Sequence, residues 1–409
     1  MFGYLNSLWQ SSPSASISRD TSPKVKKAAI DTSRRSPLAT NTMGCQLAIS
    51  TMSLGRCFAG HTLERRLQLA SQHGYRGIEL WHEDLLDVGD RLAGGSDTPA
   101  RRIRAASLVR GMCVALGLEV VCLQPFMHYE ALADRAAHAR RLAELAHWVD
   151  LAHALGTDLV AVPSSFLPEG QVSADAGLVA ADLRAAADLC AAADPPLRLT
   201  YEALSWGTHV DTWEASWAAV QAADRPNLGI CLDTFNIGAR IYADPADPSG
   251  RTADCDAAVA ESMARLVRVV DVAKVFYVQV VDGERLPDGP LVEGHRFHVA
   301  GQLPRMSWSR NCRLFYREED RGAYLPVRDI AAAIFNGLGF RGWVSLELFN
   351  RRMNDADPEV PRELARRGVE SWDRLCADMS TGDGEWESAA AGGQADDTSA
   401  GAHQQYSRL

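Results

Sequence analysis

The sequence predicts a closed (β/α)₈ barrel that forms a single domain. Two observations predict it: eight short apolar segments alternate with eight helical segments, and glycines follow several of the helices. Repeated strand–helix units with short links give parallel strands joined by right-handed crossovers, and eight such units can close into a barrel. A doubly wound open sheet is the alternative arrangement of the same units.

Each predicted strand or helix has an apolar pattern of its own, and several end at a recognisable residue. The strands are predicted at about 47–49, 77–81, 119–123, 159–162, 197–204, 227–232, 275–280 and 343–348. The helices that follow them are predicted at about 63–73, 98–116, 133–155, 174–193, 212–223, 253–270, 327–338 and 361–378. Gly74, Gly117 and Gly156 stand where a helix C-terminal glycine belongs. A long interruption, up to about Tyr324, separates the seventh strand from its helix.

The predicted barrel domain occupies residues 45–379, between two segments without a sustained hydrophobic period. Residues 1–44 are rich in Ser, Thr, Pro and Lys, and residues 380–409 are rich in Gly, Ala, Ser, Asp and Gln. Such composition cannot form a packed core, so both segments are predicted to be disordered tails.

The composition excludes several classes of function. Hydrophobic residues make up 46% of the chain and charged residues 23%, which is typical of a globular enzyme. A formal net charge of −10 argues against a nucleic-acid partner, and we find no apolar run long enough to span a bilayer. The nine cysteines are scattered without a C-x-x-C pair, as in a cytoplasmic protein with reduced thiols. The sequence leaves open whether the chain forms a homo-oligomer.

Four consecutive predicted strands, the fifth to the eighth, each end near one oxygen-bearing side chain. These residues are Glu202, Asp233, Gln279 and Glu347. The active site of a (β/α)₈ barrel lies at the carboxyl ends of its strands. A single carboxylate there can simply cap a helix or pair with an arginine, but several at equivalent positions would repel one another unless a cation lay between them.

The residue types indicate which cation such a site would hold. Two glutamates, one aspartate and one glutamine suit a hard or borderline divalent cation such as Mg²⁺, Mn²⁺ or Co²⁺. A closed structural zinc site is disfavoured, because it would usually have thiolate or imidazole ligands.

The segments around these residues resemble a known superfamily. Five of them, Ser50–Arg56, Gly77–Asp84, Glu202–His209, Leu232–Phe235 and Glu347–Arg351, are similar to the xylose isomerase-like TIM-barrel superfamily. More narrowly, Glu202–His209 and Pro304–Arg313 resemble the 3-dehydroshikimate dehydratases of quinate catabolism, in particular the fungal type. The resemblance covers about residues 46–378. The barrel and the Glu/Asp/Glu ligands are shared with sugar isomerases and epimerases, so they discriminate little.

The resemblance implies an activity and a set of roles. The activity is the metal-dependent loss of water from 3-dehydroshikimate to give protocatechuate. The implied metal ligands are Glu202, Asp233, Gln279 and Glu347. Ser309 and Arg313 would hold the substrate carboxylate, for which an arginine is well suited. The alternative for Arg313 is a surface ion pair with Glu318 or Glu319.

The dehydration also requires a base and an acid, and two residues are candidates. His209 is the first, because its unperturbed pKa lies near neutral pH and it falls in the loop after the fifth strand. Its alternative is a structural role, such as a hydrogen bond to a loop carbonyl. Glu79, at the end of the second strand, is the other candidate, and it could instead pair with Arg56. Bacterial dehydratases tend to carry a histidine three residues after the aspartate ligand, where this chain has Asn236.

Three other functions share some of these features. A metal-dependent sugar isomerase or epimerase would use the same ligands, but Gln279 and the segment with Ser309 and Arg313 argue against it. An apurinic-site endonuclease would need more histidine ligands and a basic groove. A non-catalytic metal-binding paralogue is disfavoured by the complete ligand set. Trp81, Phe126, Trp206 and Trp308 could line a pocket for a flat ring or simply pack in the barrel.

Overall fold

A closed barrel of eight parallel strands forms the centre of the protein. The structure, a computed structural model, describes residues 43–92 and 97–380. Apart from their innermost residues, the predicted tails 1–44 and 380–409 lie outside the described ranges. The strands follow one another around the barrel in the order β1-β10-β7-β6-β5-β4-β3-β2, and β1 pairs with both β2 and β10. The prediction of a closed barrel is therefore confirmed, and the open-sheet alternative is excluded.

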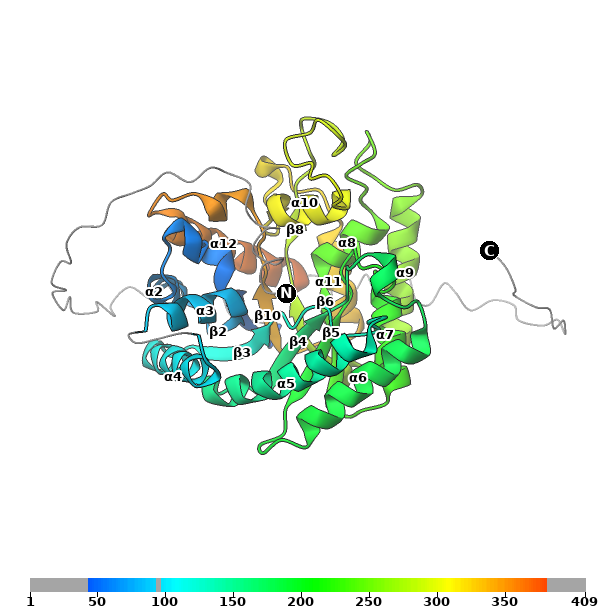
Figure 1. The fold of residues 1–409 in the computed structure, drawn as a ribbon. Helices are drawn as coiled ribbons and strands as arrows, with labels where there is room; N and C mark the ends of the chain where they lie inside the picture. The colour runs from blue at the N-terminus through cyan, green and yellow to red at the C-terminus, as the bar shows by residue number, and fades with distance from the viewer. Residues whose placement is uncertain (1–42, 93–96, 381–409) are drawn as a thin grey trace, which may run out of the picture. The chain divides into compact units, whose positions relative to one another are not determined.

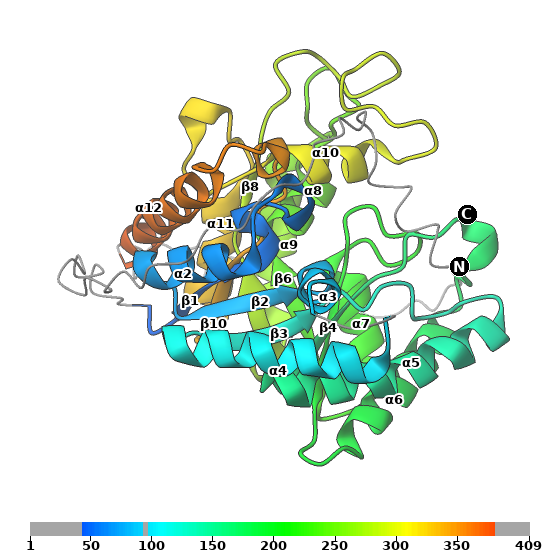
Figure 2. The same ribbon diagram turned by 60° about the vertical axis from the view of Figure 1, so that its left-hand side comes forward.

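The strands alternate with helices that surround them (Figure 1 and Figure 2). The barrel strands are β1 Gln46–Ser50, β2 Gly77–Trp81, β3 Glu119–Gln124, β4 Leu159–Pro163, β5 Arg198–Glu202, β6 Leu228–Asp233, β7 Val275–Gln279 and β10 Trp343–Leu346. The helices are α2 Leu63–His73, α3 His82–Asp90, α4 Pro99–Leu116, α5 Arg135–Leu155, α6 Ala176–Ala191, α7 Trp213–Ala223, α8 Thr234–Ile241, α9 Cys255–Val269, α10 Pro304–Cys312, α11 Val327–Ala332 and α12 Val360–Ser380.

The helix boundaries follow from capping residues in the sequence. The hydroxyl of Thr62 accepts a hydrogen bond from the N–H of Arg65 and so caps the start of α2. At the C-terminal ends of α2, α4 and α5, the predicted glycines adopt positive φ angles of 95°, 67° and 80°. Glycine adopts this left-handed conformation at little cost, so these helices end where the sequence predicts.

Five of the strands and α-helices were not predicted, and three of them lie between β7 and α11. The predicted interruption before Tyr324 contains the short strand β8 (Asp282–Gly283), helix α10 and the short strand β9 (Arg313–Leu314). The antiparallel pair β8–β9, α8 and α10 lie close together at one end of the barrel (Figure 1 and Figure 2). Short helices α3 and α8 also begin immediately after β2 and β6, where only loops were expected.

Two layers of polar side chains fill the barrel interior near the strand ends. Glu202, Asp233, Gln279 and Glu347 form the upper layer, and each has a buried residue two positions earlier. These earlier residues are Thr200, Cys231, Tyr277 and Ser345. The two-residue period of a strand places both members of each pair on the same face. The parallel register aligns Asp233 with Gln279, and it aligns Gln279 with Ser345, two residues before Glu347.

Two further predictions concern membrane-spanning segments and the cysteines. Among the described residues, none of the helices has the length and apolar character needed to cross a membrane. All nine cysteines are free thiols, and all except Cys57 are buried. Burial raises the pKa of the Cys113 thiol to about 12, which makes it unreactive.

Candidate metal centre and active site

Three carboxylates from β5, β6 and the end of β10 converge at one end of the barrel. Glu202 is the last residue of β5, Asp233 is the last residue of β6, and Glu347 directly follows β10. One carboxylate oxygen of each lies within 4.8 Å of the others, and all three side chains are buried. Asp233 also caps α8, because its Oδ1 accepts a 2.8 Å hydrogen bond from the N–H of Phe235. The arrangement could hold a metal ion.

Gln279, at the end of β7, lies against the fourth buried carboxyl group, that of Glu79. Its Nε2 donates a 2.9 Å hydrogen bond to Glu79 Oε2, which orients the amide. Gln279 Oε1 and Glu79 Oε1 are both buried and have no hydrogen-bond partner among the described residues. A buried oxygen without a partner is costly, so an additional ligand in the site would compensate both atoms. The donor set of this cluster therefore fits a hard divalent cation.

Two amide side chains connect the carboxyl groups in pairs. Asn236 Nδ2 donates to Glu202 Oε1 and to Asp233 Oδ2, both at 2.8 Å. Gln124 Nε2 donates to Glu79 Oε2 at 2.7 Å and to Glu347 Oε1 at 3.0 Å. Sequence reasoning assigned no role to either residue. Gln124 could have been predicted as a site residue from the sequence. It is the last residue of β3, just as Asp233 and Gln279 are the last residues of β6 and β7.

Arg313 places its guanidinium against two of the carboxylates. Its Nη1 lies 3.0 Å from Asp233 Oδ2 and 3.1 Å from Glu347 Oε2. Its Nε donates to Ser309 Oγ at 3.1 Å, so the two predicted substrate-binding residues lie together in the site. Arg313 Nη2 makes no hydrogen bond with any residue that the structure describes. The side chain is only 1% exposed, and it is held between the rings of Phe235 and Phe349, 4.4 and 4.9 Å from their centres.

The surface ion pair considered for Arg313 is therefore wrong. Glu318 pairs with Arg367, and Glu319 pairs with Arg317. Arg313 is instead positioned by β9, where its N–H donates to the carbonyl of Phe349 at 3.0 Å. Its own carbonyl accepts a 2.8 Å hydrogen bond from Asn350 Nδ2. These contacts attach the segment after β7 to the end of β10.

Burial raises the pKa of every carboxyl group in the cluster, and repulsion by neighbouring carboxylates adds to the rise for Glu79, Glu202 and Glu347. Burial raises the pKa of Glu79 to about 7 and that of Glu347 to about 8, although Arg313 lowers the latter. The pKa of Glu202 is well above its ordinary value, because burial is reinforced by Glu347 and Asp233. The pKa of Asp233 is also raised by burial, against the opposing effect of Arg313. One guanidinium does not neutralise four carboxylates, and a divalent cation would lower all four values.

The two candidates for proton transfer lie in different surroundings. Glu79 is fully buried beside Gln279 and Gln124, so it is not the rim carboxylate that pairs with Arg56. Arg56 instead forms an ion pair with Glu83. His209 is half-buried, and its Nε2 lies 3.2 Å from the carbonyl oxygen of Val172. This contact matches the structural alternative for His209, and the structure does not bring its ring to the carboxylates within the described residues.

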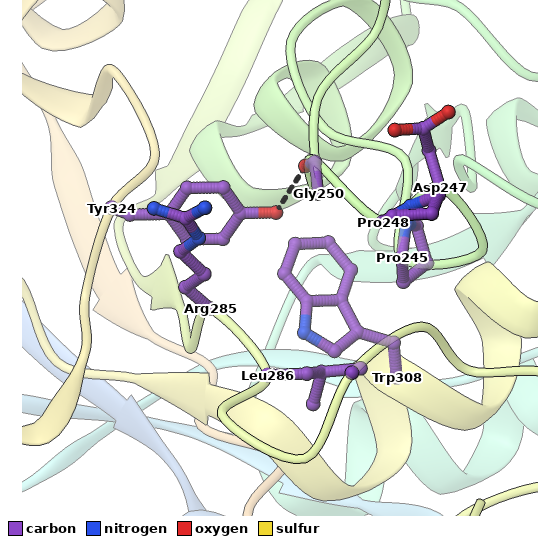
Figure 3. A pocket seen from close by; sticks show the side chains of 9 residues that line it. Pro245, Asp247, Pro248, Gly250, Arg285, Leu286, Trp308 and Tyr324 are labelled. Carbon is purple, nitrogen blue, oxygen red and sulfur yellow. Dashed lines mark hydrogen bonds between the residues drawn. The ribbon is translucent and has the colours of Figure 1, made fainter.

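A separate hollow lies beside α10 (Figure 3). It is lined by Pro245, Asp247, Pro248, Gly250, Arg285, Leu286, Gly289, Trp308 and Tyr324. Trp308 packs against Phe235 with 4.8 Å between the ring centres, and Phe235 in turn contacts Arg313. Trp308 therefore contacts the Arg313 site through the ring of Phe235. None of the clustered carboxylates lines the hollow.

The chain is thus a closed (β/α)₈ barrel whose buried acidic cluster could hold a metal ion. A family model described as a xylose isomerase-like TIM barrel matches residues 67–375, which include all seven acidic and amide residues of the cluster. The chain belongs to this family.

Two relatives and one solved structure are similar to this chain over most of its length. The chain is 57% identical over 342 residues to a 3-dehydroshikimate dehydratase of Neurospora crassa, a match that covers 82% of this chain and 95% of the relative. It is 32% identical to a 3-dehydroshikimate dehydratase of Pseudomonas aeruginosa over 75% of this chain, but spans only 38% of that protein. Among solved structures, a xylose isomerase-like TIM barrel/4-hydroxyphenylpyruvate dioxygenase fusion protein matches with a TM-score of 0.60 and 28% identity. That match covers 84% of this chain and 45% of the fusion protein.

Proposed function

We propose that this chain dehydrates 3-dehydroshikimate to protocatechuate. The observation that carries the proposal is a buried arginine, Arg313, placed directly against the acidic cluster. A substrate with both a carboxylate and a ketone needs such a combination: a cation for the ketone oxygen and a guanidinium for the carboxylate. The match to the Neurospora crassa relative covers 95% of that protein, which is named a 3-dehydroshikimate dehydratase. This similarity supports the proposed activity.

The residues that would hold the metal are Glu202, Asp233, Gln279 and Glu347. Their oxygens suit Mg²⁺, Mn²⁺ or Co²⁺, and none of the four offers a thiolate or imidazole. When bound, the cation would act as a Lewis acid toward the ketone and stabilise the negative charge that develops on its oxygen.

Arg313 and Ser309 would orient the ring through its carboxylate. Arg313 Nη2 donates no hydrogen bond to any described residue, so its N–H groups are available to the substrate. Ser309 Oγ accepts a hydrogen bond from Arg313 Nε, so the serine hydroxyl hydrogen is available as a second donor. A carboxylate held at these two groups would be bound by charge-assisted hydrogen bonds. The phenyl rings of Phe235 and Phe349 hold the guanidinium in place without competing for its N–H groups.

The reaction removes one proton and one hydroxide from the ring. A base takes the proton from the carbon next to the ketone, and the hydroxyl on the following carbon then leaves as water after it is protonated. Loss of a further ring proton to the ketone oxygen, by tautomerisation, gives the aromatic catechol ring. Glu79 has a pKa near neutrality and an unpartnered Oε1 in the described structure, so it is well suited to exchange the proton. His209 remains the second candidate.

A direct assay tests the proposal. Purified protein is incubated with 3-dehydroshikimate and Mg²⁺, Mn²⁺ or Co²⁺, and the ultraviolet absorbance of protocatechuate is followed. We expect product with at least one of these cations, and no conversion of a ketose sugar under the same conditions. Absence of protocatechuate with all three cations would overturn the proposed activity. A cytoplasmic location remains a prediction from the sequence, which leaves homo-oligomer formation open.

A further inference from the structure

Asn236 lies in the first turn of α8, three residues after Asp233, and is buried at the centre of the acidic cluster. Its Nδ2 carries two hydrogens, and both are used: one for Glu202 Oε1 and one for Asp233 Oδ2, each at 2.8 Å. Its Oδ1 accepts a 3.0 Å hydrogen bond from the N–H of Ser205. Since a backbone N–H can only donate, this contact fixes the amide with its nitrogen toward the carboxylates.

These contacts leave the second carboxylate oxygen of Glu202 available. Asn236 binds Oε1 of Glu202, while Oε2 makes no hydrogen bond with any residue in the described ranges. Ser205 belongs to the loop after β5, and Asn236 belongs to the helix after β6, so the side chain joins two neighbouring loops. A neutral donor does this without adding a charge that would compete with a cation.

Gln124 forms a similar bridge between the other two carboxyl groups, because its Nε2 donates hydrogen bonds to both Glu79 and Glu347. The cluster thus contains two amide groups, each bridging two carboxyl groups. Of the two, only Asn236 bridges a pair made entirely of candidate metal ligands.

We propose that Asn236 is a positioning residue that holds Glu202 and Asp233 in the geometry required by a shared divalent cation, and that it thereby sets the affinity of the site. This inference rests on the proposed metal ligation by Glu202 and Asp233. Hydrogen bonds to metal-ligating groups commonly change metal affinity by about 10–100-fold when they are removed.

The test measures metal binding directly and not turnover. Mn²⁺ is titrated into the chelator-treated full chain by calorimetry, for the wild type, Asn236→Ala and Asn236→Leu. The leucine variant preserves volume if the alanine variant does not fold. The matched control is Asn227→Ala: Asn227 precedes β6 at the opposite end of the same strand, and its Nδ2 also donates two hydrogen bonds, to the carbonyls of Ala187 and Leu197. Co²⁺ absorption spectra report the coordination geometry of each variant.

We expect Asn236→Ala or Asn236→Leu to bind Mn²⁺ about 10–100-fold more weakly and to change the Co²⁺ spectrum. Asn227→Ala should keep wild-type affinity and spectrum even where its unfolding temperature falls. If the Asn236 variants bind Mn²⁺ as tightly as the wild type, the positioning role is wrong while the metal site stands. If the wild type itself binds no divalent cation, the proposed metal function is wrong, and this inference fails with it.

Discussion

At the scale of residues, the site is governed by the balance between one guanidinium and four buried carboxyl groups. Arg313 contacts Asp233 and Glu347 directly, whereas Glu79 and Glu202 are contacted by amide donors. A buried carboxylate without a compensating charge is costly. The chain therefore depends on specific neighbours for each group, and conservative substitutions should have large effects.

Replacement of Arg313 by lysine should raise the KM for 3-dehydroshikimate about 10–100-fold, because lysine keeps the charge but not the planar fork that binds a carboxylate at two points. Steady-state kinetics at saturating Mn²⁺ measure the change. The matched control is Arg366→Lys, since Arg366 forms an exposed pair with Glu370 on α12. A KM within twofold of the wild type for Arg313→Lys would remove this residue from substrate binding.

The two candidates for proton transfer can be separated by their glutamine variants. Glu79→Gln should lower kcat by about 10²–10⁴-fold, because the amide cannot exchange the proton. His209→Gln should lower it less than about tenfold, since the ring contacts a backbone carbonyl, that of Val172. Single-turnover rates across pH 6–9 measure both. If His209→Gln lowers kcat more than Glu79→Gln does, His209 and not Glu79 is the group that transfers the proton.

At the scale of elements, short loops after the strands bring the residues of the site together. The loop after β5 turns tightly at Gly207: a Cβ there would lie 2.2 Å from the carbonyl oxygen of Val210 and 2.7 Å from Ser164 Oγ. Only glycine fits without movement of the backbone. The same loop carries Ser205, which fixes Asn236.

Gly207→Ala should therefore lower the free energy of unfolding by about 1–3 kcal/mol through overpacking. The urea midpoint measures the loss. Gly111→Ala is the matched control, because Gly111 lies within α4 with no atom within 4 Å of the added Cβ. Alanine in a helix should stabilise the protein there, by up to about 1 kcal/mol. Equal midpoints for the two variants would contradict the close approach at Gly207.

The sequence was sufficient to predict the barrel elements but not all the contacts between them. Regular alternation and helix-ending glycines identified every barrel strand, and the two-residue period brought Glu202, Asp233, Gln279 and Glu347 to one end. Short elements such as α8 and α10 have too few residues for a period to be recognised. The partners of Arg313 could not be predicted, because Asp233 lies 80 residues earlier and only the fold brings the two together.

At the scale of the whole molecule, the acidic cluster links stability to pH and to metal. The pKa values of Glu79 and Glu347, about 7 and about 8, lie above the ordinary value of a glutamate. Between the ordinary value and these values the folded state binds more protons than the unfolded state. The stability contributed by these protons is therefore lost as the pH rises through about 7 to 8.

The metal-free protein should accordingly lose on the order of 1–3 kcal/mol of unfolding free energy between pH 6 and pH 8.5. Added Mn²⁺ should reverse the loss at pH 8.5, by about 2.7 kcal/mol at a concentration 100 times its dissociation constant. Urea unfolding at each pH, with and without Mn²⁺, measures both effects. A metal-free protein that becomes more stable toward pH 8.5 would contradict the raised pKa values.

We propose that four residues on neighbouring strands hold a divalent cation on which dehydration depends. The test is the initial rate of protocatechuate formation as Mn²⁺ is added back to chelator-treated wild-type protein and to Glu347→Gln. We predict no product in chelator, a saturable return of the wild-type rate, and no return for Glu347→Gln although it folds. A full wild-type rate in chelator, or a Glu347→Gln variant as active as the wild type, would contradict the claim.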